Sequence, residues 1–170
     1  LKKKCFQMFD GSTLFLDRDG VINKKLEGRY VRFFEEFSFM PGAITAISKL
    51  SQVFQYIIII TNQQGIGKGL MTEIELDLLH KQMIHELKKK GGKIDAIYYC
   101  ADLASKKCNC RKPGTKMFEN ALKDFPKIDI MKSYMIGDSD SDIQAGNAMQ
   151  LNTVKVNNIY TLAKWADEFL

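Results

Sequence analysis

The chain contains four isoleucines in a row, Ile57 to Ile60, with Tyr56 before them and Thr61-Asn62 after them. A short, uniformly apolar run of β-branched residues is typical of a strand that is covered on both of its faces. A sheet with one wet face would instead show apolar and polar residues in alternation. The run therefore predicts a parallel sheet with helices on both sides, and it is far too short to cross a membrane.

Further strand-like runs alternate with helix patterns along the chain. The strands are expected at Thr13–Asp17, Ile94–Cys100, Ser133–Asp138 and Asn152–Val156. The helices are expected from Pro41 (with Ile44, Ile47 and Leu50 on one face), from the Thr72/Glu75 capping box to Gly91, and at Met117–Phe125, Ile143–Met149 and around Leu162–Phe169. This alternation predicts an α/β fold, a Rossmann-like three-layer sandwich with a mainly parallel sheet.

The length and composition predict one domain over residues 1–170. The chain has 170 residues, 45% hydrophobic and 26% charged, which is ordinary for a soluble globular protein. Residues 23–41 are too few for a separate cap domain, and residues 62–111 are already used by a helix, a strand and a cysteine-bearing loop. The first residues have no apolar stretch of signal-peptide length, so we expect a cytoplasmic protein.

The net charge of +5 suits an anionic substrate or a weak contact with nucleic acid. The lysines are scattered, without the basic and aromatic interleaving of a nucleic-acid groove, so neither nucleic acid nor membrane is an expected partner. We expect a monomer.

Polar residues follow four of the expected strands. Asp17 ends the first one and Asp19 lies two residues further on, and both point to the same side if the extended geometry persists. Two such carboxylates repel unless a cation or a shared proton offsets them, although a polar Asp-Gly turn is an alternative reading. Thr61-Asn62, Cys100 and Asp138 also follow strands, and the carboxyl ends of parallel strands meet in one crevice. This convergence favours a functional site.

The later polar residues indicate what the crevice binds. Asp138, Asp140 and Asp142 add carboxylates suited to Mg²⁺, although we assign Asp140 to capping of the following helix. Arg111 and Lys112 are suited to phosphate, but such a pair is more often a solvated surface feature. The glycine-rich turn after Thr61-Asn62 offers backbone N–H groups but is not a Walker loop.

In order and strand placement, "FLDRDGVIN", "ITNQQG", "CRKP" and "IGDSDSDI" resemble the four motifs of the haloacid dehalogenase superfamily of phosphatases. The resemblance implies an Mg²⁺-dependent phosphomonoester hydrolase that forms an aspartyl-phosphate. It implies Asp17 as the nucleophile, Asp19 as the acid and then the base, and Thr61 and Lys112 as residues that hold the phosphoryl group. It also implies that Asp17, Asp138 and the carbonyl of Asp19 bind Mg²⁺ and that Asp142 supports them.

One subgroup is most similar: small phosphatases that act on histidinol phosphate or on D-glycero-D-manno-heptose 1,7-bisphosphate. Its members carry a structural zinc on a C-x-H…C-x-C loop. The corresponding residues here, within a loop at 100–110, are Cys100, Asp102, Cys108 and Cys110, so an aspartate replaces the histidine. The fourth cysteine, Cys5, stands alone, and we interpret His80 and His85 as ordinary helix residues.

Loops are expected to select the substrate. The resemblance implies substrate contacts from two loops and the "CRKP" motif: Glu27, Tyr30, Thr61, Asn62, Gln63, Gln64, Arg111 and Lys112. The Tyr30-Val31 match and the stand-alone length favour the heptose bisphosphate and hence carbohydrate metabolism, whereas the short cysteine loop is closer to the histidinol-phosphate members. Alternatives of other classes are a nucleic-acid 3′-phosphatase and a non-catalytic metal-binding module.

Overall fold

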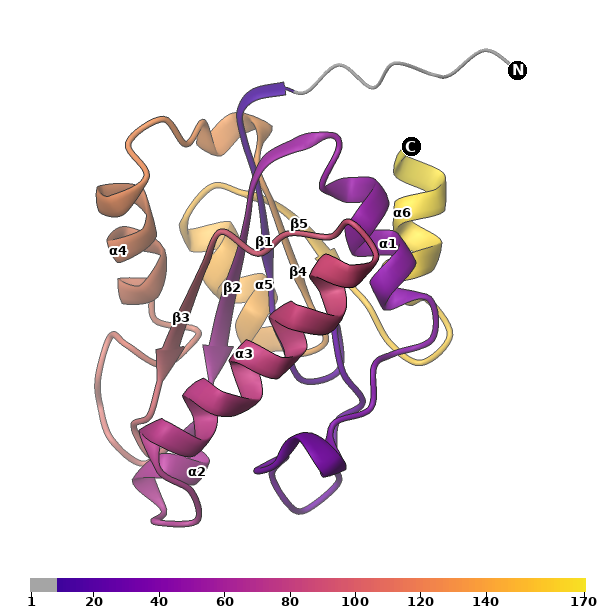
Figure 1. The fold of residues 1–170 in the computed structure, drawn as a ribbon. Coiled ribbons are helices and arrows are strands. Elements are labelled where there is room, and N and C mark those ends of the chain that lie inside the picture. Colours follow the sequence, from indigo (N-terminus) through magenta and orange to yellow (C-terminus); the bar gives the residue numbers. More distant parts are fainter. Residues whose placement is uncertain (1–8) are drawn as a thin grey trace.

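The computed structural model describes residues 9–170, and Cys5 lies outside them. Its centre is a five-stranded, all-parallel sheet in the order β3-β2-β1-β4-β5 (Figure 1). The strands are β1 (Phe9–Leu16), β2 (Phe54–Asn62), β3 (Ala96–Cys100), β4 (Tyr134–Gly137) and β5 (Asn152–Lys155). All five predicted strands are present, which confirms the parallel α/β fold.

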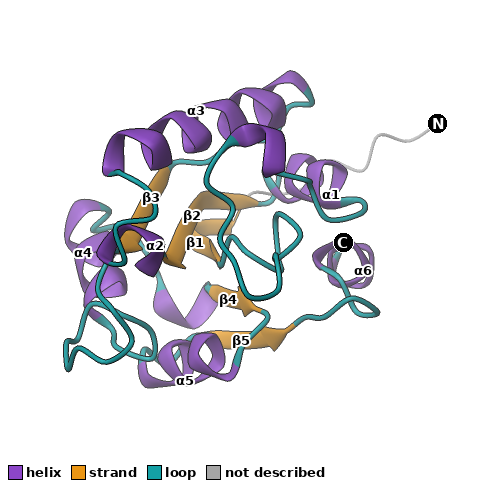
Figure 2. Ribbon diagram, turned by 90° about the horizontal axis from the view of Figure 1, so that it is seen from below, coloured by secondary structure: helices purple, strands orange, loops and turns teal. Residues whose placement is uncertain are grey.

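Helices cover both faces of the sheet, as Figure 2 shows in a view onto the carboxyl ends of the strands. One face carries α1 (Ala43–Leu50), α3 (Glu73–Lys89) and α6 (Leu162–Phe169), and the other carries α4 (Lys116–Asp124) and α5 (Asp140–Ala148). The short α2 (Gln64–Gly67) follows β2. Two 3₁₀ turns, η1 (Phe34–Glu36) and η2 (Ile130–Lys132), lie in connections.

The isoleucine run supplies both hydrophobic cores. Ile57 and Ile59 belong to the cluster that contains residues of α1, α3 and α6, whereas Ile58 and Ile60 belong to the cluster under α4 and α5. All four side chains are fully buried. Because successive side chains of a strand point to opposite faces, a run without polar residues fits only a strand that is covered twice.

The order of the strands locates the crevice. The chain passes from β1 to β2 on one side and later returns to β4 on the other side of β1. Ligands of open α/β sheets bind beyond the carboxyl ends of the strands at such a reversal. The segment between β1 and α1 contains η1 as its one named helical element.

Several predicted boundaries were wrong. The first helix begins at Ala43 instead of Pro41, because Gly42 precedes it with φ +75°, and a Cβ there would lie 2.8 Å from that of Ala163. Helix α5 begins at Asp140, three residues before the predicted start, because Ser139 and Asp142 form a capping box. Helix α2 replaces part of the predicted glycine-rich turn.

None of the helices among residues 9–170 combines the length and the apolar composition that crossing a lipid bilayer would need.

Candidate active site

The polar residues after β1, β2 and β4 meet at one edge of the sheet. Asp17 directly follows β1, Thr61 and Asn62 end β2, and Asp138 directly follows β4. With Tyr30, Arg111 and Lys112, several of them line one cavity of about 250 Å³. The predicted convergence is therefore present for three of the four strands, whereas Cys100 at the end of β3 does not line this cavity.

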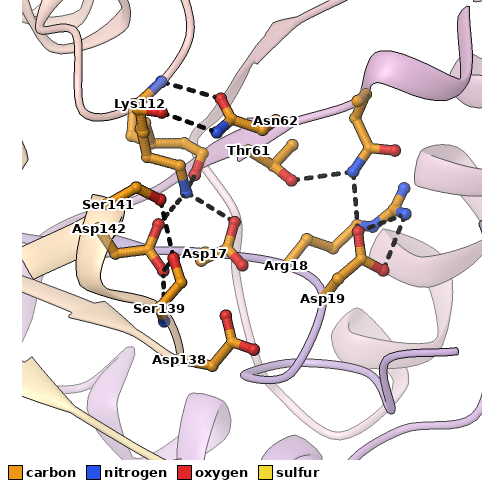
Figure 3. A network of polar contacts seen from close by, with 12 residues as sticks. Asp17, Arg18, Asp19, Thr61, Asn62, Lys112, Asp138, Ser139, Ser141 and Asp142 are labelled. Carbon is orange, nitrogen blue, oxygen red and sulfur yellow. Dashed lines mark hydrogen bonds and ion pairs between the residues drawn. The ribbon is translucent and has the colours of Figure 1, made fainter. Parts of the chain in front are cut away.

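Lys112 is the centre of the buried part of this site. Its ammonium donates hydrogen bonds to Asp17 Oδ1 (2.7 Å) and to the carbonyl oxygen of Ile60 (2.6 Å), and it lies 2.6 Å from Asp142 Oδ1 (Figure 3). Burial acts to lower the pKa of Lys112, but Asp17 and Asp142 raise it above its ordinary value. The lysine is therefore a permanent cation between two carboxylates.

Asn62 fixes the backbone that carries this lysine. Its amide donates to the carbonyl oxygen of Lys112 (3.2 Å) and accepts from the N–H of Lys112 (3.0 Å). The pair of bonds joins the end of β2 to a loop fifty residues further along the chain. Asn62 also lines the cavity, so it is placed to serve both the loop and a ligand.

Asp17 is a buried carboxylate surrounded by other charges. Burial raises the pKa of Asp17 to about 7, helped by Asp142 and Asp19, although Lys112 acts in the opposite direction. One carboxylate oxygen each of Asp17, Asp138 and Asp142 lies within 4.8 Å of the others. Such a cluster of hard oxygen donors has the chemistry of a divalent-cation site.

Asp138 belongs to this cluster and directly follows β4. The turn after β1 approaches it so closely that a Cβ on Gly20, which has φ +92°, would lie 2.5 Å from Asp138 Oδ2. The exposed Lys25 also reaches Asp138, with Nζ 3.0 Å from Oδ2. Lys25 lies in one of the two loops expected to select the substrate, but its contact with Asp138 was not predicted.

Asp142 accepts two hydrogen bonds from Ser139 besides its contact with Lys112. Its Oδ2 accepts from the backbone N–H (3.0 Å) and the hydroxyl (2.7 Å) of Ser139, which caps α5. The helix cap thus orients the carboxylate that faces Lys112. Asp140 instead lies exposed in the first turn of α5 and pairs with Lys155 at 2.6 Å. Asp140 thus lies at the helix start and away from Lys112, although the capping itself is done by Ser139 and Asp142.

Asp19 lines the same cavity, but its carboxylate has a different set of partners. Arg18 donates to both oxygens (3.0 and 2.9 Å), Asn23 donates to Oδ1 (2.9 Å), and Gln63 donates to Oδ2 (2.9 Å). Burial acts to raise the pKa of Asp19, but the Arg18 guanidinium and these hydrogen bonds outweigh it and lower the pKa below its ordinary value. In the free protein Asp19 is ionised.

The predicted substrate residues fall into two groups. The cavity is lined by Tyr30, Asn62, Gln64, Arg111 and Lys112. Gln63 does not line it: its buried side-chain amide donates to Asp19 and to the Thr61 hydroxyl (2.9 Å each). Glu27 lines a neighbouring hollow, together with Lys24 and Asn157 among others. Nη1 of Arg111 is buried without a hydrogen-bond partner among residues 9–170.

The cysteine loop lies beside this site in the chain. A sulfur or carboxylate oxygen each of Cys100, Asp102 and Cys108 lies within 4.8 Å of the others, and the thiols of Cys100 and Cys110 interact. Asp102 also pairs with Lys106 at 2.6 Å. The structure therefore brings the four predicted zinc ligands together, with a lysine competing for the carboxylate.

Two buried residues behind the site were also missed from the sequence. Arg18 lies between the two aspartates of the first motif and is fully buried, and its Nη1 lies 3.2 Å from Nε2 of His80 on α3. We interpreted His80 as an ordinary helix residue, but its ring is buried against Arg18. A histidine on the apolar side of an amphipathic helix, beside Leu76, Leu79 and Met83, was the available signal.

The sheet, the order of the four motifs and the lysine held between two carboxylates define a phosphate-transferring hydrolase of the haloacid dehalogenase type. A family model described as HAD-hydrolase-like matches residues 109–166.

Curated relatives match a larger part of the chain. D-glycero-alpha-D-manno-heptose-1,7-bisphosphate 7-phosphatase of Mycobacterium bovis is 40% identical over 131 residues, which cover 77% of this chain and 69% of the relative. D-glycero-beta-D-manno-heptose-1,7-bisphosphate 7-phosphatase of Escherichia coli is 36% identical over 148 residues, which cover 83% and 76%.

The structural comparison agrees. The D,D-heptose 1,7-bisphosphate phosphatase of B. bronchiseptica, solved with magnesium and phosphate, superposes with a TM-score of 0.85 at 28% identity, covering 93% of this chain and 97% of that one. The chain therefore belongs to the haloacid dehalogenase superfamily, within the family of heptose bisphosphate phosphatases, and it is a phosphatase.

Proposed function

We propose that this phosphatase hydrolyses the 7-phosphate of D-glycero-D-manno-heptose 1,7-bisphosphate, with Mg²⁺ and through a phosphorylated Asp17. The observation that carries the proposal is the cavity itself, which is lined by the buried Asp17–Lys112 pair and by Arg111, whose Nη1 has no hydrogen-bond partner among residues 9–170. The names of the relatives support the same substrate.

The donor set suits magnesium. Asp17 and Asp138 offer hard carboxylate oxygens that lie close together, and the backbone carbonyl of Asp19 would complete the protein ligands. Asp142 would support these ligands indirectly, because it forms an ion pair with Lys112, which also binds Asp17. When bound, Mg²⁺ supplies positive charge that offsets the repulsion between Asp17 and the phosphate.

The remaining steps use the chain's own residues. A carboxylate oxygen of Asp17 attacks phosphorus, and the leaving alkoxide takes a proton from Asp19 as the P–O bond breaks. A water molecule then attacks the phosphorus and gives its proton to Asp19, so that phosphate leaves and Asp17 is regenerated. Asp19 is ionised in the free protein, but a bound phosphate beside it raises its proton affinity.

Lys112 and Thr61 would hold the phosphoryl group during both steps. The ammonium of Lys112 neutralises charge on Asp17 and would also bind phosphate oxygens. The Thr61 hydroxyl accepts a hydrogen bond from Gln63, so its own proton is free to be donated to a phosphate oxygen.

Arg111 favours a second anionic group on the substrate. Four cations and four aspartates line the cavity, and Lys25 and Lys112 are paired with aspartates, whereas the buried Nη1 of Arg111 needs a hydrogen-bond acceptor. The remote phosphate of a sugar bisphosphate supplies such an acceptor. The amine of histidinol phosphate is a cation and cannot accept a hydrogen bond from Arg111.

Kinetics with both substrates test this assignment. We expect a higher kcat/KM for heptose 1,7-bisphosphate than for histidinol phosphate, and we expect Arg111→Met to lower the first value more than the second. A preference for histidinol phosphate would overturn the substrate and leave the phosphatase intact. Separate assays with the alpha and the beta anomer show which of the two anomers this phosphatase prefers.

The cysteine loop would hold a structural zinc. Cys100, Asp102, Cys108 and Cys110 provide three sulfurs and one oxygen, and all four positions are protein ligands with none left for water. Because Cys110 adjoins Arg111 and Lys112 in the chain, the metal would stabilise the positions of two cations of the cavity.

A further inference from the structure

The side chain of Arg18 lies between the candidate acid–base residue and a helix of the scaffold. Its Nη2 donates to both carboxylate oxygens of Asp19, and its Nη1 lies 3.2 Å from Nε2 of His80. Nε of Arg18 is buried and has no hydrogen-bond partner within the described part of the chain. Among the hydrogen bonds described, the guanidinium is therefore held at two points, one of which is His80.

His80 is suited to receive a hydrogen bond from Arg18. Burial, together with the neighbouring guanidinium, lowers the pKa of His80 to about 3, so the ring is neutral at neutral pH. A neutral ring has one acceptor nitrogen, and since an arginine only donates, Nε2 is that acceptor and Nδ1 carries the proton. The ring is 6% exposed and so is fixed by the packing around it.

The helix that carries His80 is a rigid anchor. Helix α3 spans Glu73–Lys89, begins with a complete Thr72/Glu75 capping box, and packs Leu79 and Met83 into the core. Asp19 in contrast lies in a turn between β1 and the loop of residues 24–31. Arg18 therefore links a turn of the site to a helix sixty-two residues away.

We infer that His80 is a positioning residue for the phosphatase reaction, which acts through Arg18 to fix the direction of the Asp19 carboxylate. This inference rests on the proposed role of Asp19 as the proton donor to the leaving oxygen. Asn23 and Gln63 also donate to Asp19, but each is uncharged and contacts one oxygen, whereas the Arg18 guanidinium is a cation and contacts both oxygens through Nη2.

Two variants of similar shape separate positioning from packing. His80→Gln keeps a side-chain oxygen that accepts from Arg18, whereas His80→Met is equally unbranched but offers a weak acceptor. Met83→Ala, another change at a buried α3 position, removes no hydrogen-bond acceptor of Arg18 and serves as the control for lost stability. Melting temperatures establish that each variant is folded.

The readout is kcat/KM for two substrates with different leaving groups. Heptose 1,7-bisphosphate loses an alkoxide that needs a proton as it departs, whereas p-nitrophenyl phosphate loses a stable phenolate that does not. Since kcat/KM reports the steps up to departure of the leaving group, misplacement of Asp19 lowers it selectively for the sugar phosphate. A merely structural change lowers both values together.

We expect His80→Met to lower kcat/KM for the sugar phosphate about tenfold or more relative to p-nitrophenyl phosphate, because small misplacements of catalytic groups have effects on this scale. His80→Gln and Met83→Ala should keep the wild-type ratio. An unchanged ratio in His80→Met would overturn the inference. If neither histidine variant folds, Arg18→Lys is the test, because lysine keeps the charge and loses the guanidinium that contacts both Asp19 and His80. This variant must then show the same selective loss of kcat/KM for the sugar phosphate.

The outcome for the wild type separates this inference from the function on which it rests. If wild-type protein hydrolyses neither substrate with Mg²⁺, the proposed function fails. If it hydrolyses both and the His80 variants keep the ratio, the inference alone fails.

Discussion

Replacement of His80 should make the stability of the protein less dependent on pH. The ring lies buried beside a guanidinium, and its pKa falls from 6.5 to about 3. Between these two values the unfolded chain binds a proton that the folded protein does not bind. The free energy of unfolding therefore falls as the pH falls through this interval, and the loss is present only while position 80 is a histidine.

The two pKa values give the size of the effect. At pH 5 the unfolded histidine is almost fully protonated and the folded one is not, and the pH lies about 1.5 units below 6.5. At about 1.36 kcal/mol for each unit, the wild type loses about 2 kcal/mol between pH 7 and pH 5 from this residue alone. For a chain of this length that corresponds to a melting temperature lower by roughly 4–8 °C.

Denaturant unfolding of the wild type and of His80→Gln at both pH values measures this difference. Other titrating groups, Asp17 among them, contribute equally to both proteins and cancel in the comparison. His85→Gln, an exposed change on the same helix, is the matched control and should follow the wild type. Parallel pH dependence of the wild type and His80→Gln would refute the argument, since it would mean that the folded protein protonates His80 as readily as the unfolded chain.

Three further changes test the site. Asp17→Asn removes the nucleophile and should lower kcat with Mg²⁺ by several orders of magnitude; turnover near the wild-type rate would exclude the phosphorylated aspartate. Lys112→Met leaves two buried carboxylates unpaired and should cost about 3 kcal/mol or more in urea unfolding, together with activity, whereas unchanged stability would contradict the buried contacts. Asp102→His should bind zinc at least as tightly as the wild type and Asp102→Ala less tightly, as elemental analysis measures. If wild-type protein purified under metal-replete, reducing conditions contains no zinc and has full Mg²⁺-dependent activity, the loop needs no metal.

The motifs and the sheet were predictable because their signals are local. An isoleucine run without polar residues requires cover on both faces, and alternating strands and helices require parallel pairing. Once the sheet is parallel, Asp17, Thr61 and Asp138 must meet, since each directly follows or ends a strand. The sequence alone therefore determined the fold, the edge that carries the site, and several of the residues that line it.

The partners of those residues were decided by the tertiary structure. Gln63 was expected at the substrate, but its amide is used by Asp19 and Thr61. Lys25 read as a surface lysine, yet it reaches Asp138. Neither outcome follows from spacing, because a side chain with several rotatable bonds can reach different neighbours from the same backbone position.

The Arg18–His80 contact shows the physical reason most clearly. In the sequence, Arg18 is a charged residue after a strand and His80 is one residue of a long helix. The hydrogen bond between them depends on how α3 lies across the sheet, and that placement is set by the packing of its apolar face against the whole core. Local patterns specify which elements form and where they end, whereas contacts between distant elements depend on their final relative positions, which arise only when the entire core is assembled.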